Sequence, residues 1–311
     1  MDKSRVGLLI LLLSLMAVPA FTQDPYLLNI LISTGIWTTS VWGVRVIMST
    51  GQLTLGHAAY MAVGAYASTL LTMKVGLSFW LAFPLAGLIS SLVALLIGYP
   101  TLRIKGVYFA IITFAFAEIV RLLIVHWPSL LGGYGGIPDV PPPSPILSIS
   151  FKSRVPFYYL ILAVSLVTYL VMVRIDKSRI GQVFSSIHES DTLAESIGIN
   201  IMKYKVTGFC VGCFFAGLSG SFYAHYFNFT SPEFFTVWQS VYCLVFVIVG
   251  GAGSVWGPPL GTFFMTLIPE LLRVARELEP VIYAVILIAI MFLLPGGLVT
   301  LPARLRRKKA Q

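Results

Sequence analysis

Charge is scarce in this sequence of 311 residues. Only 11% of the residues are Asp, Glu, Lys or Arg, whereas 57% are hydrophobic and the mean hydropathy is +0.89. A water-soluble protein of this length cannot bury so much apolar surface in its own core. The composition therefore excludes a soluble globular protein and indicates an integral membrane protein.

The motifs of common nucleotide-binding and hydrolytic sites are missing as well. There is no Gly-x-x-x-x-Gly-Lys-Ser/Thr loop, so the chain does not bind ATP by that device, and there is no His-Glu-x-x-His or Gly-x-Ser-x-Gly sequence. The cysteines are few, Cys210, Cys213 and Cys243, and no second sulfur or histidine pair completes a metal site with the first two. We expect buried structural thiols, no metal, no cofactor and no catalytic residue.

Long apolar runs dominate the chain instead. A helix of about 20 apolar residues spans the hydrocarbon layer, and unbroken runs of this length exclude an outer-membrane barrel, whose strands alternate. The predicted fold class is all-α, a polytopic transmembrane helix bundle of about ten spans that includes broken or re-entrant segments, as a single domain over residues 1–311. The predicted spans are 6–21, 26–44, 54–73, 78–99, 107–125, 157–173, 206–227, 239–256, 257–273 and 280–295.

The first predicted span, 6–21, follows two basic residues and is open to two interpretations. It resembles a cleavable signal peptide, but residues 17–21, Ala-Val-Pro-Ala-Phe, lack a clean small-x-small cleavage site. We expect a retained membrane anchor, with a cleaved signal peptide as the alternative.

The basic residues predict the orientation. If the amino terminus lies in the cytoplasm, most Lys and Arg residues fall on the cytoplasmic segments, in agreement with the positive-inside rule. The net charge of +9 then reflects topology and requires no nucleic acid. Both termini are predicted to be cytoplasmic, with a basic tail at 302–311 beside anionic lipid.

Three segments are too rich in glycine, proline or polar residues for regular transmembrane helix. The connection 126–156 is predicted to be an extracytoplasmic loop without regular helix, either a cap over the outer mouth or a plain linker. Segments 49–57 and 250–259 are predicted to be broken helices, turns or re-entrant segments, because irregular backbone at membrane depth must be satisfied by protein or water.

Polar residues within the spans are candidates for a solute path. Glu118 and Glu270 each precede an arginine by three residues, Arg121 and Arg273, so each pair shares a helix face and offsets part of the cost of membrane burial. Either the pairs line the path, or they are satisfied ion pairs at outer helix ends.

Other polar residues of the spans are open to the same two interpretations. His57 begins a stretch of small residues, where it contacts solute or simply fills a close helix crossing. Polar residues of the second span line water or bond across helices. The candidate path residues are Asn29, Ser33, Gln52, His57, Glu118 and Glu270.

The connection 174–205 is far too long and charged for a simple turn. Val183, Ile187, Ala194 and Ile197 recur at helical spacing between acidic residues, which predicts short amphipathic helices on the cytoplasmic face. Gly181 and Gly198 are the predicted helix breakers. The mixed charge favours a protein partner over a lipid surface, which would select a mainly basic helix.

Several motifs together resemble one family. The chain is similar to the permease subunits of branched-chain amino acid ABC importers, particularly the LivM type, from about residue 26 to residue 300. The matching segments include GQLTLGHAAYMAVGAY at 51–66, LRIKGVYFAI at 102–111, AESIGIN at 194–200, AGLSG at 216–220 and GGAGSVWGP at 250–258.

The resemblance implies a non-catalytic permease subunit of the inner membrane that translocates branched-chain amino acids or a related small solute such as urea or an amide. The partners it implies are a second related permease subunit, two cytoplasmic ABC ATPase subunits that hydrolyse the ATP, and a periplasmic or extracellular substrate-binding protein, all within membrane lipid. A stand-alone secondary transporter driven by a proton or sodium gradient is the alternative, although it should carry an acidic residue buried at mid-membrane.

By the same resemblance, 174–205 is a cytoplasmic coupling loop pushed by the ATPases. Its sequence at 194–196 reads Ala-Glu-Ser where related importers have Glu-Ala-Ala. The implied ATPase-coupling residues are Glu189, Asp191, Ala194, Glu195, Ser196, Gly198 and Asn200.

Overall fold

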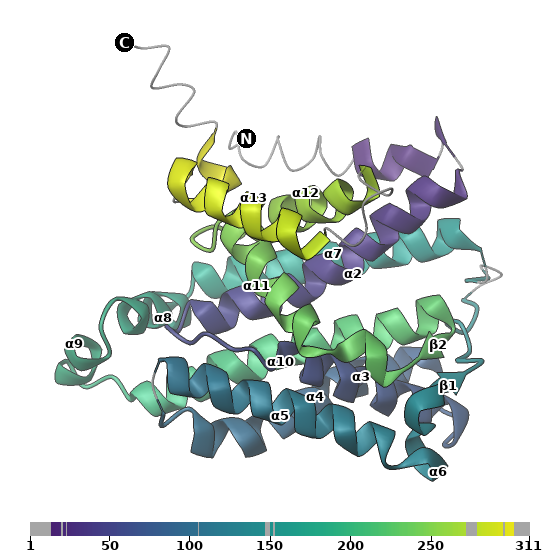
Figure 1. Ribbon diagram of the computed structural model, residues 1–311, viewed down its shortest axis with the longest axis horizontal. Coiled ribbons are helices and arrows are strands. Elements are labelled where there is room, and N and C mark those ends of the chain that lie inside the picture. The colour runs from purple at the N-terminus through teal and green to yellow at the C-terminus, as the bar shows by residue number, and fades with distance from the viewer. Residues whose placement is uncertain are drawn as a thin grey trace.

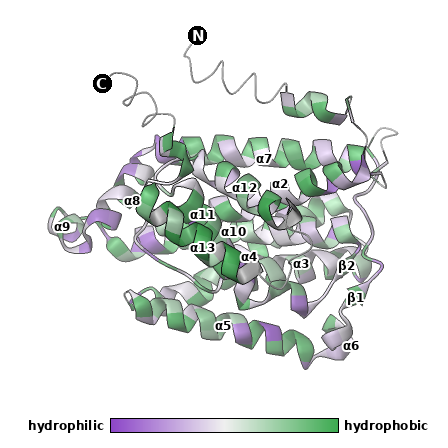
Figure 2. Cartoon of the chain, turned by 45° about the horizontal axis from the view of Figure 1, so that its top comes forward, coloured by the Kyte–Doolittle hydropathy of each residue, from purple (hydrophilic) through white to green (hydrophobic). Residues whose placement is uncertain are grey.

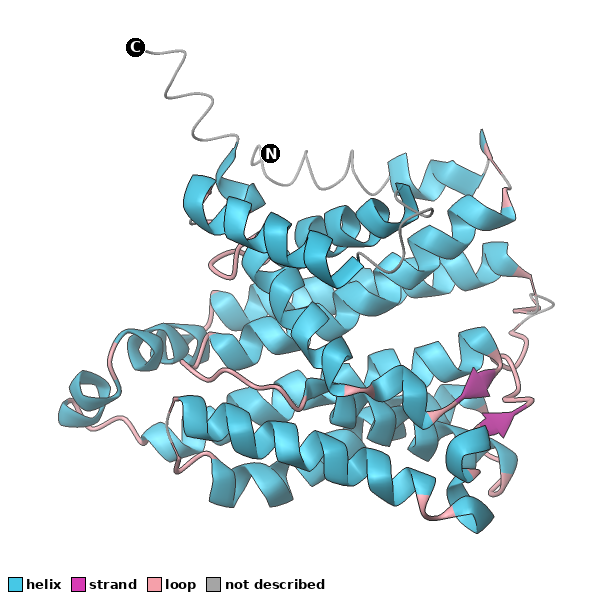
Figure 3. Cartoon of the chain, viewed as in Figure 1, coloured by secondary structure: helices cyan, strands magenta, loops and turns pink. Residues whose placement is uncertain are grey.

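The structure is a computed structural model that describes residues 14–19, 21–22, 24–104, 106–146, 150–151, 153–271, 279–294 and 296–301. The described residues form one bundle in which the long helices run side by side (Figure 1). Figure 3 shows that the strands are confined to one short pair at one end of the bundle.

Five described helices are long and apolar enough to cross a membrane, so the prediction of an all-α membrane bundle is confirmed. They are α2 (Pro25–Met48), α4 (Phe79–Thr101), α5 (Val107–Val125), α7 (Arg154–Asp176) and α10 (Ile201–Phe227). The exact count of ten spans is not confirmed, because other helices fall short of about 20 residues and the first predicted span lies largely outside the described residues. These shorter helices are α3 (His57–Met73), α11 (Val237–Gly250), α12 (Gly257–Leu271) and α13 (Glu279–Leu293).

Helix α10 lies at the centre of the bundle and packs most extensively against α4, α3 and α2. Glycines permit this close packing: a Cβ on Gly64 of α3 would collide with the backbone of Gly217 in α10, and one on Gly220 would collide with the Met61 carbonyl. Small residues at a helix crossing let the backbones approach and gain dispersion energy, which is the main attraction between helices in lipid. The predicted close packing of α3 is therefore present.

Replacement of Gly64 by Val is expected to destabilise the bundle by roughly 3 kcal/mol, because the clash is with rigid backbone rather than with a side chain that can move. Thermal unfolding in detergent measures the effect. Gly135 is the matched control, since an added Cβ there meets nothing and Gly135→Ala should leave the unfolding temperature unchanged. Equal unfolding temperatures for Gly64→Val and the parent protein would contradict the packing described here.

The connection after α5 contains more regular structure than predicted. It forms a single-turn helix α6 (Pro128–Leu131), a 3-10 turn η1 (Gly133–Gly135) and strand β1 (Ile137–Pro138), which pairs antiparallel with β2 (Phe229–Thr230). The expectation that 126–156 contains no regular helix is wrong for α6, because proline is compatible with the first turn of a helix. A further 3-10 turn, η2 (Pro232–Phe235), follows β2.

The breaks predicted near residues 49–57 and 250–259 are present, at 49–56 and 251–256. Helix α3 begins at His57 rather than at residue 54, and the preceding backbone is held by side chains: Thr113 Oγ1 accepts from Leu55 N at 3.0 Å and Thr54 Oγ1 from Gly56 N at 3.1 Å. Helix α11 ends at Gly250, and the left-handed Gly251 (φ +111°) starts a turn that leads into α12.

The end of the bundle opposite β1 and β2 carries two further helices, α8 (Arg179–Glu189) and α9 (Asp191–Ser196). They protrude beyond the ends of the long helices in Figure 1. Figure 2 shows hydrophilic residues gathered there, in contrast to the hydrophobic colour along the long helices. A last 3-10 turn, η4 (Leu298–Thr300), follows α13. The predicted basic tail at 302–311 lies outside the described residues.

Candidate functional site

The α8–α9 arm, defined as residues 178–200, is built by local capping. Ser178 Oγ accepts from Gly181 N at 3.3 Å to start α8, Ser190 Oγ accepts from Leu193 N at 3.3 Å to start α9, and Asn200 Oδ1 accepts from Lys203 N at 3.0 Å to start α10. Gly198, with φ +85°, follows α9 in the left-handed conformation. The predicted short helices are present as α8 and α9, and Gly198 lies just beyond α9.

Gly181 is not a helix breaker, contrary to prediction. It lies in the first turn of α8, where a Cβ would collide with the Ile175 carbonyl oxygen at the end of α7. Its role is to permit this close approach of α8 to α7, which turns the chain out of the bundle.

The inner face of the arm is anchored to the bundle. Phe184, Ile187 and Ala194 are buried, and Asp191 Oδ2 pairs with Lys205 Nζ of α10 at 2.7 Å with both side chains largely shielded from solvent. Asp191 therefore lies in the joint between the arm and α10. Ala194 is buried beneath the surface of the arm.

The outer face of the arm is exposed and carries the other predicted coupling residues. Two apolar side chains lie among them: Leu193 is 71% exposed and Ile197 is 75% exposed. Helix α9 ends at Ser196, so Ile197 lies beyond the helix and does not follow Ala194 on its buried face. The exposed predicted residues are Glu189, Glu195, Ser196, Gly198 and Asn200.

Leu193 is the residue of this face that the sequence reasoning missed. Leu193 lies four residues before Ile197 but falls outside the predicted apolar spacing of Val183, Ile187, Ala194 and Ile197. The available signal was a second apolar stripe on the same short segment. A helix that only packs against the bundle needs a single apolar stripe.

A partly buried ion pair supports the base of the arm, and sequence reasoning did not find it. Arg45, near the end of α2, donates to both carboxylate oxygens of Asp176 at 3.1 and 2.7 Å, and its Nε donates to the Ala252 carbonyl at 3.0 Å. A bidentate arginine–carboxylate pair is strong and directional. This contact joins α2, the end of α7 and the turn between α11 and α12.

The candidate path residues are spread over the bundle. Gln52 is buried and lines a cavity of about 280 Å³ between the arm and the segments before α3 and α5. His57 is fully buried, with Nε2 3.0 Å from the Ser40 carbonyl oxygen, and Nδ1 has no hydrogen-bond partner in the described part of the chain. Asn29 lies at the opposite end, where its Oδ1 accepts from Tyr226 Oη at 2.7 Å, and Ser33 is half-buried one turn further along α2.

The predicted ion pair between Glu118 and Arg121 is present on α5. Arg121 Nε lies 3.0 Å from each carboxylate oxygen, and both side chains are partly exposed on the outside of the bundle. Glu270 lies in the last turn of α12, and its side chain, like Arg273, falls outside the described residues. The path candidates therefore do not converge on one cavity within the described part of this chain.

The three thiols lie within helices. Cys213 and Cys243 are buried, and Cys210 is half-buried. Among the described residues, no three His, Cys, Asp or Glu side chains cluster in a way that could hold a metal ion.

Comparison with known proteins assigns the chain to a family. The family described as "Branched-chain amino acid transport system / permease component" matches residues 26–295. The "High-affinity branched-chain amino acid transport system permease protein LivM" of Salmonella typhimurium is 30% identical over 95% of this chain and 75% of the relative, and the protein of the same name from Escherichia coli has the same values. A "Probable branched-chain amino acid transport permease protein LivM" of Methanocaldococcus jannaschii is 25% identical over 70% of this chain and 67% of the relative. No solved structure matches. The chain is therefore a multi-pass membrane protein that belongs to the branched-chain amino acid transport permease family and is of the LivM type.

Proposed function

We propose that this chain is a membrane-spanning subunit of an ABC importer that carries branched-chain amino acids across the inner membrane. Its partners in this proposal are a second related permease subunit, two cytoplasmic ATPase subunits and an external substrate-binding protein. The arm side of the bundle and both termini then face the cytoplasm. The observation that carries the proposal is the exposed apolar pair Leu193 and Ile197 at the tip of a rigidly anchored arm.

An apolar pair on a protruding arm is suited to protein contact. Burial of one Leu or Ile side chain contributes about 1.5–3 kcal/mol, and Glu189 and Glu195 on the same arm add charges that can select a basic partner surface. A surface of this kind would fit a groove on one of the two ATPases, with the carboxylates at its rim.

The contacts beneath the arm supply a route for mechanical coupling. Movement of α9 by an ATPase would pass through Asp191 and Lys205 to α10, while Arg45 and Asp176 hold the base of the arm to α2. Since α10 and α2 form the centre of the bundle, the ATPases would bias the whole bundle between two arrangements. Nucleotide hydrolysis remains with the partners, and this chain is the non-catalytic conduit.

The exposed face of α5 is our candidate for the surface shared with the second permease. An ion pair in contact with hydrocarbon is unfavourable even when its two charges are adjacent, so Glu118 and Arg121 require a polar neighbour such as water in the path or a partner helix. We propose that this face of α5 borders the path between the two permeases.

Uptake by intact cells tests the substrate. Deletion of this chain in its own organism is expected to abolish high-affinity uptake of radiolabelled leucine, isoleucine and valine, and the intact chain supplied in trans should restore it. Uptake of urea and short amides serves as the comparison. Unchanged uptake of all three amino acids, with loss of urea or amide uptake, would contradict the proposed substrate class.

A further inference from the structure

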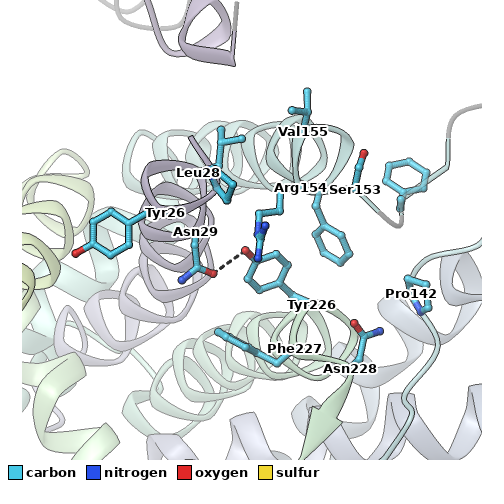
Figure 4. Close-up of a pocket in the computed structure, with 13 residues that line it drawn as sticks. Tyr26, Leu28, Asn29, Pro142, Ser153, Arg154, Val155, Tyr226, Phe227 and Asn228 are labelled. Carbon is cyan, nitrogen blue, oxygen red and sulfur yellow. Dashed lines mark hydrogen bonds between the residues drawn. The ribbon is translucent and has the colours of Figure 1, made fainter. Parts of the chain in front are cut away.

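A cavity of about 990 Å³ lies at the end of the bundle opposite the arm (Figure 4). It is a half-open pocket bordered by the first turns of α2 and α7 and the last turn of α10. Ligand pockets commonly measure roughly 300–1,000 Å³, so this cavity is large enough for a small molecule or a headgroup.

The polar centre of the cavity is a set of three side chains from three helices. Tyr226 Oη of α10 donates to Asn29 Oδ1 of α2 at 2.7 Å, and the guanidinium of Arg154 at the start of α7 lies beside the Tyr226 hydroxyl in Figure 4. Because the Tyr226 hydroxyl donates its proton to Asn29, its oxygen is left to accept from the neighbouring guanidinium of Arg154. With respect to the described residues, the remaining guanidinium N–H groups are available to a ligand.

No carboxylate is present among the described residues that line this cavity. Asp24 directly precedes the lining residue Pro25 in the sequence. It is an exposed helix cap, and its Oδ1 accepts from Tyr26 N at 3.0 Å at the start of α2. Arg154 therefore has no acidic partner in the described lining, in contrast to Arg45 and Arg121, which each pair with a carboxylate.

The walls around this polar centre are apolar. Leu28, Phe151 and Phe157 are buried beside the cavity, and Phe227 closes another side. A fixed cation next to aromatic and aliphatic walls is complementary to a molecule that joins one anionic group to an apolar body. The planar guanidinium binds a carboxylate or a phosphate through two parallel hydrogen bonds.

We infer that this cavity binds a small amphiphilic molecule. Arg154 binds the carboxylate or phosphate group of this molecule, and the apolar part of the molecule packs against Phe157 and Leu28. Tyr226 and Asn29 position the guanidinium. A free amino acid and a phospholipid headgroup both offer this chemistry. If the occupant is the amino acid, the site deepens the proposed function as a binding point at the outer end of the path.

Direct binding measurements test the site without relying on transport. The full chain is placed in nanodiscs that contain phosphatidylglycerol, and binding of radiolabelled leucine is measured by scintillation proximity. After gentle delipidation, native mass spectrometry measures the phosphatidylglycerol that the chain retains. Leucine binding identifies the solute as the occupant, and lipid retention identifies the headgroup. Arg154→Gln should weaken binding of the observed ligand on the order of tenfold. Arg154→Lys should weaken it less, and the effect of Tyr226→Phe should lie between those of the two Arg154 variants.

Lys74→Gln is the matched control, because Lys74 is an exposed basic residue at the end of α3 outside the cavity lining. It should bind as the parent protein does, and the Arg154 variants should keep the parent unfolding temperature, since Arg154 is exposed. Binding of both probes that is unaffected by Arg154→Gln, or binding of neither probe by the parent chain, would overturn the inference. Either result would leave the proposed import function standing if deletion of the chain still abolishes amino acid uptake.

Discussion

Replacement of Leu193 and Ile197 together by Asp is expected to abolish stable association with the ATPase subunits while the helical bundle stays folded. Both side chains are more than two-thirds exposed, so the change removes little packing within the chain. If each contributes about 1.5–3 kcal/mol to the interface, their combined loss weakens binding by more than a hundredfold. Co-purification of the ATPases with the tagged chain measures the effect.

A control for this variant must add charge to an exposed apolar position elsewhere. Val75 is 65% exposed after α3, and Val75→Asp should retain full ATPase recovery. Circular dichroism and gel filtration check that the arm variant remains folded. Normal recovery of the ATPases with Leu193→Asp/Ile197→Asp would refute the assignment of the arm as their docking surface.

Asp176→Leu is expected to lower the free energy of unfolding by roughly 3 kcal/mol. The substitution leaves Arg45 without its counter-charge, and the Arg45 side chain is only 5% exposed whereas Asp176 is 35% exposed. Removal of Asp176 alone destabilises the fold more than removal of both partners, because the charge of the buried Arg45 side chain then remains uncompensated. The loss of stability is measured by thermal unfolding in detergent, in which the fraction of protein that stays monodisperse is recorded at each temperature.

The double variant Arg45→Met/Asp176→Leu distinguishes the effect of an unpaired buried charge from the effect of losing the ion pair. It should recover most of the stability lost by the single change, since no unpaired charge remains. Arg174→Gln is the surface control, because Arg174 is exposed on the same helix only two residues away. A fully stable Asp176→Leu chain, or a double variant less stable than the single one, would show that the pair does not support this end of the bundle.

Features that depend on neighbouring residues were predictable from the sequence. The long helices follow from unbroken apolar runs, and the Glu118–Arg121 pair follows from a spacing of three on one helix. The break between α11 and α12 follows from consecutive glycines. Helix lengths were less predictable: α11 is shorter than its apolar run because the chain turns at Gly251.

Features that depend on the tertiary arrangement were not predictable. Nothing local indicates that Arg45 meets Asp176, which is 131 residues away, or that Asp191 pairs with Lys205 instead of lying open on the arm. Asn29 was selected as a polar residue of a membrane span, but its place beside Tyr226 and Arg154 depends on three separate helix ends meeting. Such contacts join segments whose sequences carry no common pattern.

Leucine accumulation by proteoliposomes tests most directly whether this chain is a conduit driven by separate ATPases. The chain reconstituted with a second permease, both ATPases and the binding protein should accumulate leucine only when ATP is supplied on the ATPase side. The chain reconstituted alone should accumulate none under a proton or sodium gradient. Accumulation by the isolated chain against a leucine gradient, without nucleotide, would contradict the proposed function.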